Sequence, residues 1–447
     1  MGKVDDESPA GPKCTRRQAL LGTAALAAAF AVPGCSSARS ARVRSATDAN
    51  PNPDLSSWEG VRAEFDVDPD LIHMAAMLLS SHPRPVREAI EAHRRGLDDN
   101  PVDYLFEHWA RSEERLDDDA EQWAMEAAAR YLDVPAARIA LTHNTTTGLA
   151  MVYNGIDIRP DQEVLSAHWN HWASEGSIQY AAEKRGFSRR RAHLVDDLQT
   201  ITADELTDRL VDQITPETRV VASTWVHSDT GLRLPVGAMG RRIEEINQAR
   251  AAEDRILFVV DGVHGFGVED ATFADLHCDF LIAGCHKWLF GPRGTGLIAA
   301  GADAWQHVTP TIPTFSMSIT QGRRFTPGGF HAFEHRWALH QAFEFHQQIG
   351  KGRIAQRTHE LSGRLTEEIA ELPHVHMTTP VSPELRSGIV VFSVDGHGTY
   401  EVLDHLRRHQ IIGSVSTGDV RQPRLSPSIL NDHTEIDAII DALWELG

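Results

Sequence analysis

Cysteine is scarce in this chain, which has only four in 447 residues: Cys14, Cys35, Cys278 and Cys285. The last two lie in apolar surroundings without a CxxC or Cys/His ligand spacing, so neither a disulfide framework nor a zinc site is expected. Lysine and arginine are also few, 43 against 63 aspartate and glutamate, and the formal net charge is −20. Such an acidic surface argues against nucleic acid or anionic lipid as a partner.

Histidine, in contrast, is abundant, with 24 copies. Most of the histidines are scattered singly along the chain, and single histidines are more often structural or exposed than metal ligands. The sequence therefore predicts no metal site.

A short apolar run near the N-terminus predicts a targeting segment. Residues 19–32 carry no charge, follow Arg16-Arg17 and precede Gly34-Cys35. A helix of that length spans about 21 Å, less than the ~30 Å hydrocarbon core, so a signal peptide is favoured over a transmembrane helix. The paired arginines resemble a twin-arginine signal, and Gly34-Cys35 resembles a lipoprotein cleavage site with Cys35 acylated. We therefore expect export, to the periplasm or to a membrane through a lipid anchor at Cys35.

From about residue 120, short β-rich runs alternate with stretches of helical periodicity. Such alternation is typical of an α/β fold with a mostly parallel sheet covered on both faces. The predicted strands are residues 138–142, 163–166, 219–224, 255–260 and 279–283, and the predicted helices are 145–153, 173–184, 203–213 and 238–252.

After about residue 330 the pattern changes. A long helical segment at residues 333–371, two β-like runs at 388–394 and 411–415, and a final helix from Thr434 indicate a smaller α+β domain. The predicted organisation is a signal peptide at 1–35, a flexible linker at 36–57, an N-terminal segment packing with the small domain at 58–85, a large domain at 86–328 and a small domain at 329–447.

Two predicted strands end in residues that suggest catalysis. One ends at Asp261, and the next is followed by Lys287 and a glycine-rich stretch. Pyridoxal phosphate (PLP) catalysis needs this pair, because a lysine amine holds the cofactor as a Schiff base and a carboxylate keeps the pyridine nitrogen protonated. Taken singly, Asp261 suits a turn and Lys287 a solvated charge. A dinucleotide loop at residues 262–267 is disfavoured, since its glycines follow GxxGxG rather than GxGxxG.

A polar segment after the first predicted strand suits an anion. Asn144-Thr145-Thr146-Thr147 opens a helix, and hydroxyls with free backbone N–H groups at a helix start can bind a phosphate. The same residues also serve as an ordinary helix cap.

Together these segments resemble the class V aminotransferase family of fold-type I PLP enzymes, which includes cysteine desulfurases and isopenicillin N epimerase-like proteins. The resemblance runs from about residue 60 to the C-terminus. It implies a large domain with a seven-stranded-type, mostly parallel sheet and a smaller α+β domain. It assigns Lys287 to the Schiff base, Asp261 to the pyridine nitrogen and His264 to the phenolic oxygen. The implied phosphate ligands are Thr145, Thr146 and His286, with Gly284 where many relatives carry serine.

The resemblance also implies roles for residues on two further loops. The ring stacked on the cofactor is expected to be His171, with Trp172 and Trp169 as alternatives. Ser228 falls at the polar position beside the phenolic oxygen, and His227 is its alternative.

Two more segments complete the implied site. The segment containing Gly329 resembles the loop that reaches the phosphate of a neighbouring subunit, which implies a homodimer with shared active sites. Arg424 resembles the residue that binds the substrate carboxylate, which a guanidinium can hold through two parallel hydrogen bonds.

The absence of a cysteine from the C-terminal part of the chain limits the reactions to be expected. Desulfurases of this family need a cysteine in a mobile loop of the small domain, and no cysteine follows Cys285. The remaining possibilities are transamination, epimerisation, elimination, and oxidative deamination or decarboxylation, of an amino acid or of a peptide product as in periplasmic siderophore-tailoring enzymes. An alternative from another class is a non-catalytic ligand-binding lipoprotein on the same fold.

Overall fold

The structure is a computed structural model, and it describes residues 54–109, 119–315, 320–418 and 420–447. The predicted signal peptide, with Arg16, Arg17 and Cys35, lies outside the described residues, as does most of the predicted linker. None of the helices in the described ranges is both long and apolar enough to cross a membrane.

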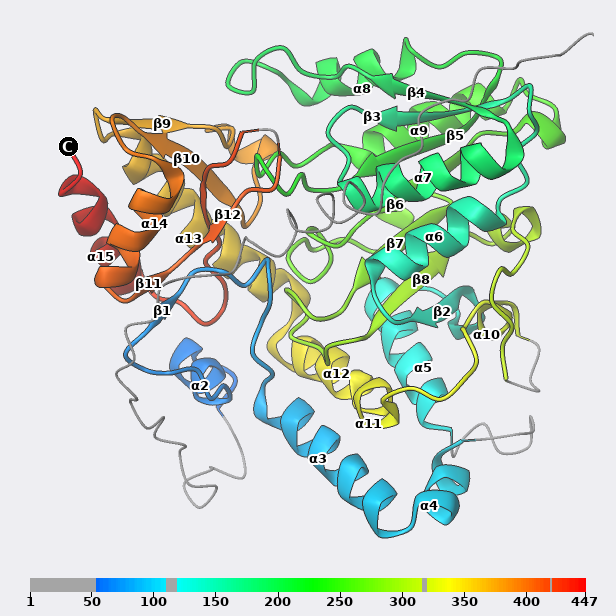
Figure 1. Ribbon diagram of the computed structural model, residues 1–447, viewed down its shortest axis with the longest axis horizontal. Helices are drawn as coiled ribbons and strands as arrows, with labels where there is room; N and C mark the ends of the chain where they lie inside the picture. Colours follow the sequence, from blue (N-terminus) through cyan, green and yellow to red (C-terminus); the bar gives the residue numbers. More distant parts are fainter. Residues whose placement is uncertain (1–53, 110–118, 316–319, 419) are drawn as a thin grey trace, which may run out of the picture. The chain divides into compact units, whose positions relative to one another are not determined.

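A seven-stranded sheet forms the centre of the large domain (Figure 1), with strand order β2-β8-β7-β6-β5-β3-β4. β8 is antiparallel to both neighbours, and the other neighbouring pairs are parallel. This confirms the predicted mostly parallel α/β sheet. The strands are β2 (Ile139–Thr142), β3 (Glu163–Ala167), β4 (Ser188–Ala192), β5 (Thr218–Thr224), β6 (Leu257–Asp261), β7 (Phe280–Gly284) and β8 (Gly296–Ala300).

Helices cover both faces of this sheet because its strands are apolar on both sides. In β5, for example, Val221 belongs to one hydrophobic cluster while Val220 and Ala222 belong to the opposite one. The first cluster includes residues of α5 (Ala120–Leu132), α8 (Ala203–Val211), α9 (Val236–Asn247) and α12 (Leu339–Ile349), and the second includes residues of α6 (Thr145–Gly155) and α7 (Trp172–Arg185).

A second, antiparallel sheet has the strand order β12-β13-β10-β9 and packs with three helices. This arrangement agrees with the α+β character predicted after residue 330. The strands are β9 (Val375–Met377), β10 (Val390–Val394), β12 (Ser414–Val415) and β13 (Pro423–Leu425), and the helices are α13 (Lys351–Ala370), α14 (Thr399–Arg408) and α15 (His433–Trp444).

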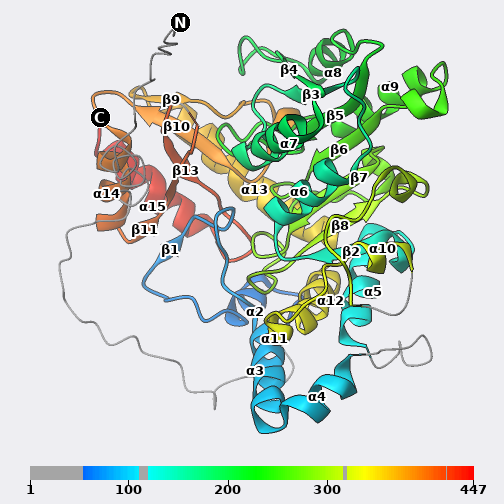
Figure 2. The ribbon, with the colours of Figure 1, turned by 45° about the vertical axis from the view of Figure 1, so that its right-hand side comes forward.

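The N-terminal part of the described chain joins this second region. β1 (Ile72–His73) pairs in parallel with β11 (Ile411–Ile412), and Figures 1 and 2 both show the two strands side by side. The backbone N–H of Ser426 donates to the carbonyl of Met74 at 2.8 Å. The domain boundaries themselves stay predictions. The remaining helices are α2 (Trp58–Ala63), α3 (Arg84–Asp99), α4 (Pro101–His108), α10 (Gln321–Arg324) and α11 (Phe333–Trp337).

The long helical segment predicted at residues 333–371 is helical over almost its whole length, and it is divided into three helices. α11, α12 and α13 are separated at Ala338 and at Gly350, whose φ of 98° lies outside the helical range.

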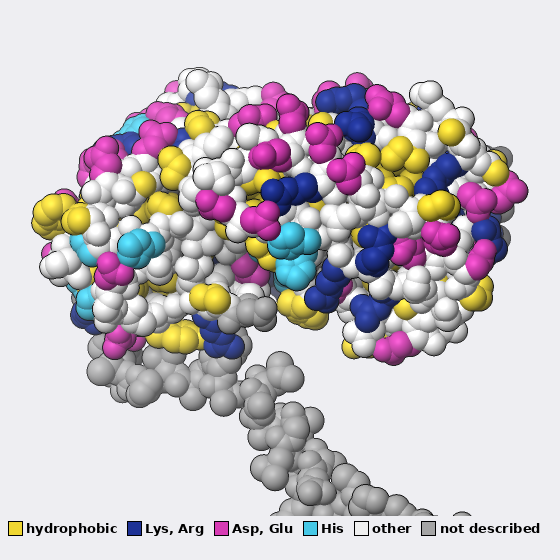
Figure 3. Space-filling view, turned by 90° about the horizontal axis from the view of Figure 1, so that it is seen from above, with side chains coloured by type: hydrophobic (Ala, Val, Ile, Leu, Met, Phe, Trp, Pro, Cys, Tyr) yellow, Lys and Arg dark blue, Asp and Glu magenta, His cyan; other side chains and the backbone are white. Residues whose placement is uncertain are grey.

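The surface charges are mixed. On the face in Figure 3, acidic and basic side chains are interspersed, and no continuous basic patch is visible on that face.

Candidate active site

The predicted site residues follow the carboxyl ends of neighbouring strands. Asp261 is the last residue of β6, and it lies in register with Thr224 of β5 and Ile282 of β7. Lys287 follows the end of β7 by three residues. Because the three strands are parallel, these residues meet at one edge of the sheet, where ligands bind in open α/β folds.

Lys287 projects into a buried environment beside a histidine. Its Nζ lies 3.4 Å from Nε2 of His264, within hydrogen-bonding distance. Burial lowers the pKa of Lys287 to about 8, although the Asp261 carboxylate opposes the shift. Such an amine is partly unprotonated near neutral pH, and it can therefore act as a nucleophile.

Asp261 is 3% exposed, and its Oδ1 accepts a hydrogen bond from the backbone N–H of Val263 at 3.2 Å. Burial raises the pKa of Asp261 to about 6, although the Val263 N–H and Lys287 both favour the ionised form. A cation placed against this carboxylate would relieve the cost of burying its charge.

Two of the residues expected to bind the phosphate, Thr145 and Thr146, lie at the start of α6. Asn144 caps the helix by accepting the backbone N–H of Thr147 at 2.8 Å, and Thr145 is the first helical residue. The Oγ1 of Thr145 is buried and has no hydrogen-bond partner among the residues that the structure describes. Thr146 beside it is exposed. Thr145 is thus available to an incoming acceptor, and Thr146 lies at the same helix start.

Gly284 brings the start of α6 together with the residue before the lysine. A Cβ added at Gly284 would lie 2.9 Å from Thr145 Oγ1 and 3.0 Å from Cε1 of His286. Burial lowers the pKa of His286 to about 4, with Lys287 adding to the shift. A serine at position 284 would therefore require Thr145 or His286 to move.

Of the three candidates for a stacking ring, His171 is placed best. Trp172 is 68% exposed, and the ring of Trp169 already stacks on His227 at 5.5 Å between centroids. His171 is the N-cap of α7, and its pKa is lowered to about 4 by burial, with the charge of Lys287 adding to the shift.

Ser228, rather than His227, has an unused hydrogen-bonding atom. Ser228 is buried, and its Oγ has no hydrogen-bond partner in the described part of the chain. Nδ1 of His227 is already hydrogen-bonded to Oγ1 of Thr230 at 2.8 Å. The geometry therefore favours Ser228 for the polar position.

Arg424 lies in β13 and reaches the large domain. Its Nε donates to Ser414 Oγ at 3.1 Å, and its Nη1 donates to the Ser228 carbonyl at 2.7 Å and lies 3.6 Å from Asp229 Oδ1. Nη2 has no hydrogen bond to any described residue. Burial lowers the pKa of Arg424 to about 10, although Asp229 opposes this.

Gly329 is the one candidate residue that is not tied to this group within the single chain. It has a φ of 112°, and its carbonyl is hydrogen-bonded to Nδ1 of His331 at 3.0 Å. Its expected role depends on a second copy of the chain, so it stays a prediction.

The residues present fit PLP. A lysine amine, a buried carboxylate and a helix start meet in one place, and three buried polar atoms there have no hydrogen-bond partner among the described residues. These atoms are Thr145 Oγ1, Ser228 Oγ and His264 Nδ1. Buried polar atoms are normally paired, so three unpaired ones around one lysine indicate a polar ligand.

The aminotransferase class-V family model matches residues 111–425, which is more than half of the chain. The chain belongs to the class V aminotransferase family. It is a PLP-dependent enzyme. The expected non-catalytic alternative is therefore not supported.

Two relatives align over nearly their whole length. The chain is 27% identical over 413 residues to isopenicillin N epimerase of Streptomyces clavuligerus, covering 87% of this chain and 98% of that protein. It is 25% identical to the isopenicillin N epimerase of Amycolatopsis lactamdurans, covering 88% and 99%. The fold matches that of the enzyme C-DES, solved with glycine covalently linked to its PLP cofactor, with a TM-score of 0.76, 22% identity, and coverage of 89% of this chain and 100% of that one.

Asp229 and Ser414 were missed in the sequence, although both contact Arg424. The only available signal was the adjacency of Asp229 to Ser228 in a polar loop of this class V chain. Asp229 precedes Arg424 by 195 residues in the sequence, and Ser414 contacts Arg424 across the paired strands β12 and β13. Sequence spacing reveals neither contact.

Proposed function

We propose that the protein is an exported PLP enzyme that acts at the α-carbon of an amino acid, or of an amino-acid group in a larger product, with Lys287 holding the cofactor and moving the proton. The observation that supports this best is the position of the Lys287 amine, 3.4 Å from His264 and electrostatically coupled to the buried Asp261.

When bound, PLP withdraws electrons from the substrate through its ring and so weakens the bonds at the α-carbon. Asp261 would hold the pyridine nitrogen in its protonated form, because a neighbouring N–H cation would stabilise the buried carboxylate. Nδ1 of His264 and Oγ of Ser228 have no hydrogen-bond partner in the described ranges, so both could hydrogen-bond the phenolic oxygen.

Lys287 has two tasks at the same nitrogen. Its Nζ would hold the cofactor, and it would also take a proton from the substrate α-carbon or return one to it. Because burial lowers its pKa to about 8, both the amine and the ammonium are accessible near neutral pH. His171 would cover the face of the cofactor ring and keep water from it.

Arg424 is proposed to orient the substrate through its carboxylate. Nε and Nη1 are held by Ser414 and the Ser228 carbonyl, so the guanidinium is fixed before substrate arrives, and Nη2 remains to donate. A prefixed guanidinium binds a carboxylate with less loss of side-chain entropy than a mobile one.

Epimerisation is the reaction that the relatives favour, because the two isopenicillin N epimerases align over 98% and 99% of their own lengths. Desulfuration is disfavoured by the absence of a cysteine after Cys285. A peptide-linked amino acid is a suitable substrate for an exported enzyme, which would be separated from the keto-acid pools used in transamination.

The test is proton exchange at the α-carbon. The PLP-loaded enzyme is incubated in D₂O with a panel of L- and D-amino acids and short peptides, and loss of the α-proton signal is followed by NMR, with oxygen uptake and keto-acid formation measured in parallel. Exchange with inversion of configuration supports epimerisation. Steady oxygen-independent turnover of a simple amino acid with a keto acid identifies a plain aminotransferase.

The control is Lys287→Ala, which should abolish exchange with every substrate. If the loaded parent enzyme exchanges no α-proton in the whole panel, action at the α-carbon of these compounds is refuted.

The proposal of export depends on residues 16–35, whose basic pair, apolar run and Gly34-Cys35 resemble a twin-arginine signal with a lipidation site. A twin-arginine route suits a PLP enzyme, since it carries proteins that have folded around a cytoplasmic cofactor. The proposed location is the periplasm or a membrane, with an anchor on Cys35.

The proposed homodimer also depends on the resemblance. Gly329 is followed by Phe330, which is 78% exposed, and such an exposed aromatic ring on a loop is a candidate subunit contact. Light scattering of the purified protein measures its mass in solution, and a monomer that retains PLP and activity would contradict shared active sites.

A further inference from the structure

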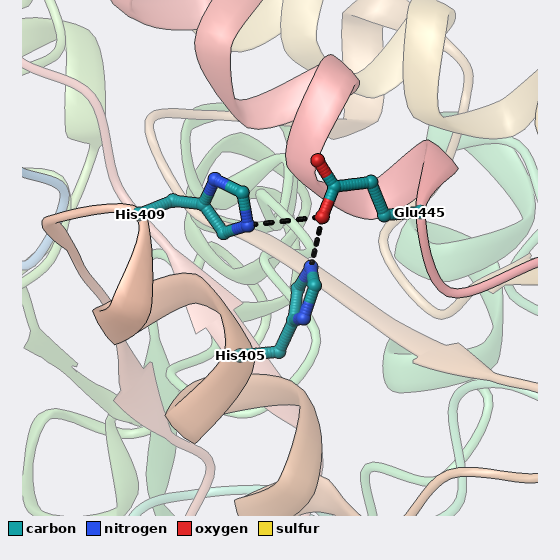
Figure 4. Close-up of side chains that lie close together, drawn as sticks. All are labelled: His405, His409 and Glu445. Carbon is teal, nitrogen blue, oxygen red and sulfur yellow. Dashed lines mark ion pairs between the residues drawn. The ribbon is translucent and has the colours of Figure 1, made fainter.

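Two histidines and a glutamate meet on the small domain, away from the residues around Lys287. His405 lies in the last turn of α14, and His409 is the residue that ends that helix. A spacing of four residues places both rings on one face, one turn apart. Glu445 ends α15, and Figure 4 shows one of its carboxylate oxygens directed at both rings.

The spacing of the three side chains suits a metal ion. Oε2 of Glu445 lies 3.1 Å from Nε2 of His409 and 3.7 Å from Nε2 of His405. The three ligand atoms all lie within 4.8 Å of one another. Bonds of about 2.0–2.1 Å to zinc place tetrahedral ligands roughly 3.4 Å apart, so small side-chain rotations would suffice.

We propose that His405, His409 and Glu445 form a binding site for a divalent transition-metal ion, with Zn²⁺ the best fit. Two imidazoles and one carboxylate are a ligand set that zinc accepts, whereas Mg²⁺ and Ca²⁺ prefer oxygen ligands. His409 and Glu445 are exposed, so water can complete the coordination.

His405 must exchange two hydrogen bonds to take part. Its Nε2 is hydrogen-bonded to the Ala442 carbonyl at 2.7 Å, and its Nδ1 to Nη2 of Arg408 at 3.2 Å. Arginine only donates, so Nδ1 accepts and Nε2 carries the proton. On metal binding, Nε2 bonds to the ion, the proton moves to Nδ1, and the exposed Arg408 turns to water.

The exchange of hydrogen bonds at His405 determines the expected affinity for the metal ion. The metal bond to His405 replaces the bond to Ala442, so the affinity should be lower than that of a preformed structural zinc site and lie in the micromolar range. Because the ligands come from α14 and α15, a bound ion would link the C-terminal helix of the chain to its neighbour.

The experiment is titration of the chelator-treated, PLP-loaded protein with ZnCl₂ by calorimetry, with CoCl₂ as an optical probe. The test variants are His409→Ala and Glu445→Gln, both at exposed positions where the fold should tolerate the change. The matched control is His376→Ala, since His376 is exposed and hydrogen-bonded to the Asp395 carboxylate at 2.8 Å. Among the described residues, no third ligand atom completes a group with this pair.

We expect one zinc site whose affinity falls at least tenfold in both test variants and is unchanged in the control. Bound Co²⁺ should show the intense visible bands of tetrahedral coordination, and Zn²⁺ should raise the thermal midpoint of the parent but not of His409→Ala. Equal zinc affinity in the parent and His409→Ala, or an equal loss in the control, would overturn the proposal.

Discussion

Replacing Asp261 by asparagine should lower the turnover and PLP retention of the enzyme, and it should raise the stability of the cofactor-free protein. In the cofactor-free protein this carboxyl is buried, and its pKa is raised from the ordinary 3.8 to about 6. The ionised form therefore costs free energy in the folded state, which the uncharged asparagine avoids. With PLP bound, the same carboxylate faces a protonated ring nitrogen and becomes favourable.

The size of the effect follows from the pKa. A change from 3.8 to about 6 corresponds to about 3 kcal/mol at 1.36 kcal/mol per pH unit. Because the folded-state pKa is raised, the cofactor-free parent should lose stability as the pH rises from about 4 to 6. Above pH 6, Asp261→Asn without cofactor should be more stable than the parent by up to about 3 kcal/mol. Below pH 4 the two should be equal.

The assay is thermal unfolding of parent and variant, each with and without PLP, between pH 4 and 8. With PLP the order should reverse, because loss of a charge-assisted bond costs about 2–5 kcal/mol, or roughly 30- to 5,000-fold in cofactor retention or turnover. A cofactor-free variant that is less stable than the parent at every pH would refute the reasoning, as would near-normal turnover.

Three further changes test the remaining assignments. Lys287→Ala should leave the fold largely intact but prevent covalent attachment of PLP. Borohydride reduction and mass spectrometry of the parent should locate a pyridoxyl group on Lys287. An adduct on another lysine would contradict the assignment. Arg424→Lys should raise KM for carboxylate substrates about tenfold or more with a smaller effect on kcat, since lysine cannot reproduce the fixed fork; an unchanged KM would exclude the role. Arg16→Lys with Arg17→Lys should leave the precursor in the cytoplasm, as shown by fractionation, and normal export would point to a route for unfolded chains.

The sheet was predictable where burial is strongest. All five strands predicted in this sheet exist within one or two residues, because a strand covered on both faces is a continuous apolar run. β4 was missed because it is an edge strand with the sequence Ser-Arg-Arg-Arg-Ala and largely exposed side chains. β8 was missed because it begins in the glycine-rich stretch that follows Lys287, where glycine suggested a loop.

The helical segment predicted at residues 333–371 shows a limit of periodicity, which did not indicate where one helix ends and the next begins. The apolar pattern continues across Gly350, so the pattern alone does not reveal the break. The positive φ of that glycine turns the chain between α12 and α13, and one glycine inside a helical pattern is common enough that it did not signal a turn.

The site was predictable where its chemistry is local to a strand end. Asp261 and Lys287 each follow an apolar run, so their positions followed from the sheet. The choice between Ser228 and His227 could not be made from the positions of the strands. It depends on whether the imidazole of His227 is already hydrogen-bonded to Thr230. The histidine pair at 405 and 409 was visible as a helical spacing, but Glu445 approaches only through the packing of α14 against α15.

Three unpaired polar atoms in the candidate site link cofactor binding to the stability of the fold. Thr145 Oγ1, Ser228 Oγ and His264 Nδ1 are buried and have no partner within the described part of the chain. Each such atom costs about 1–3 kcal/mol when left unsatisfied. Tight packing nearby holds one of them in place: a Cβ at Gly148 would lie 2.6 Å from Ile282, so α6 sits close against β7 and cannot easily shift to satisfy Thr145. The fold therefore holds these three polar atoms in position for a ligand, and this lowers the stability of the cofactor-free protein. The burial of Asp261 lowers it further. Because a single polar ligand at the strand ends would satisfy all of these groups together, cofactor retention and thermal stability should be coupled in this protein.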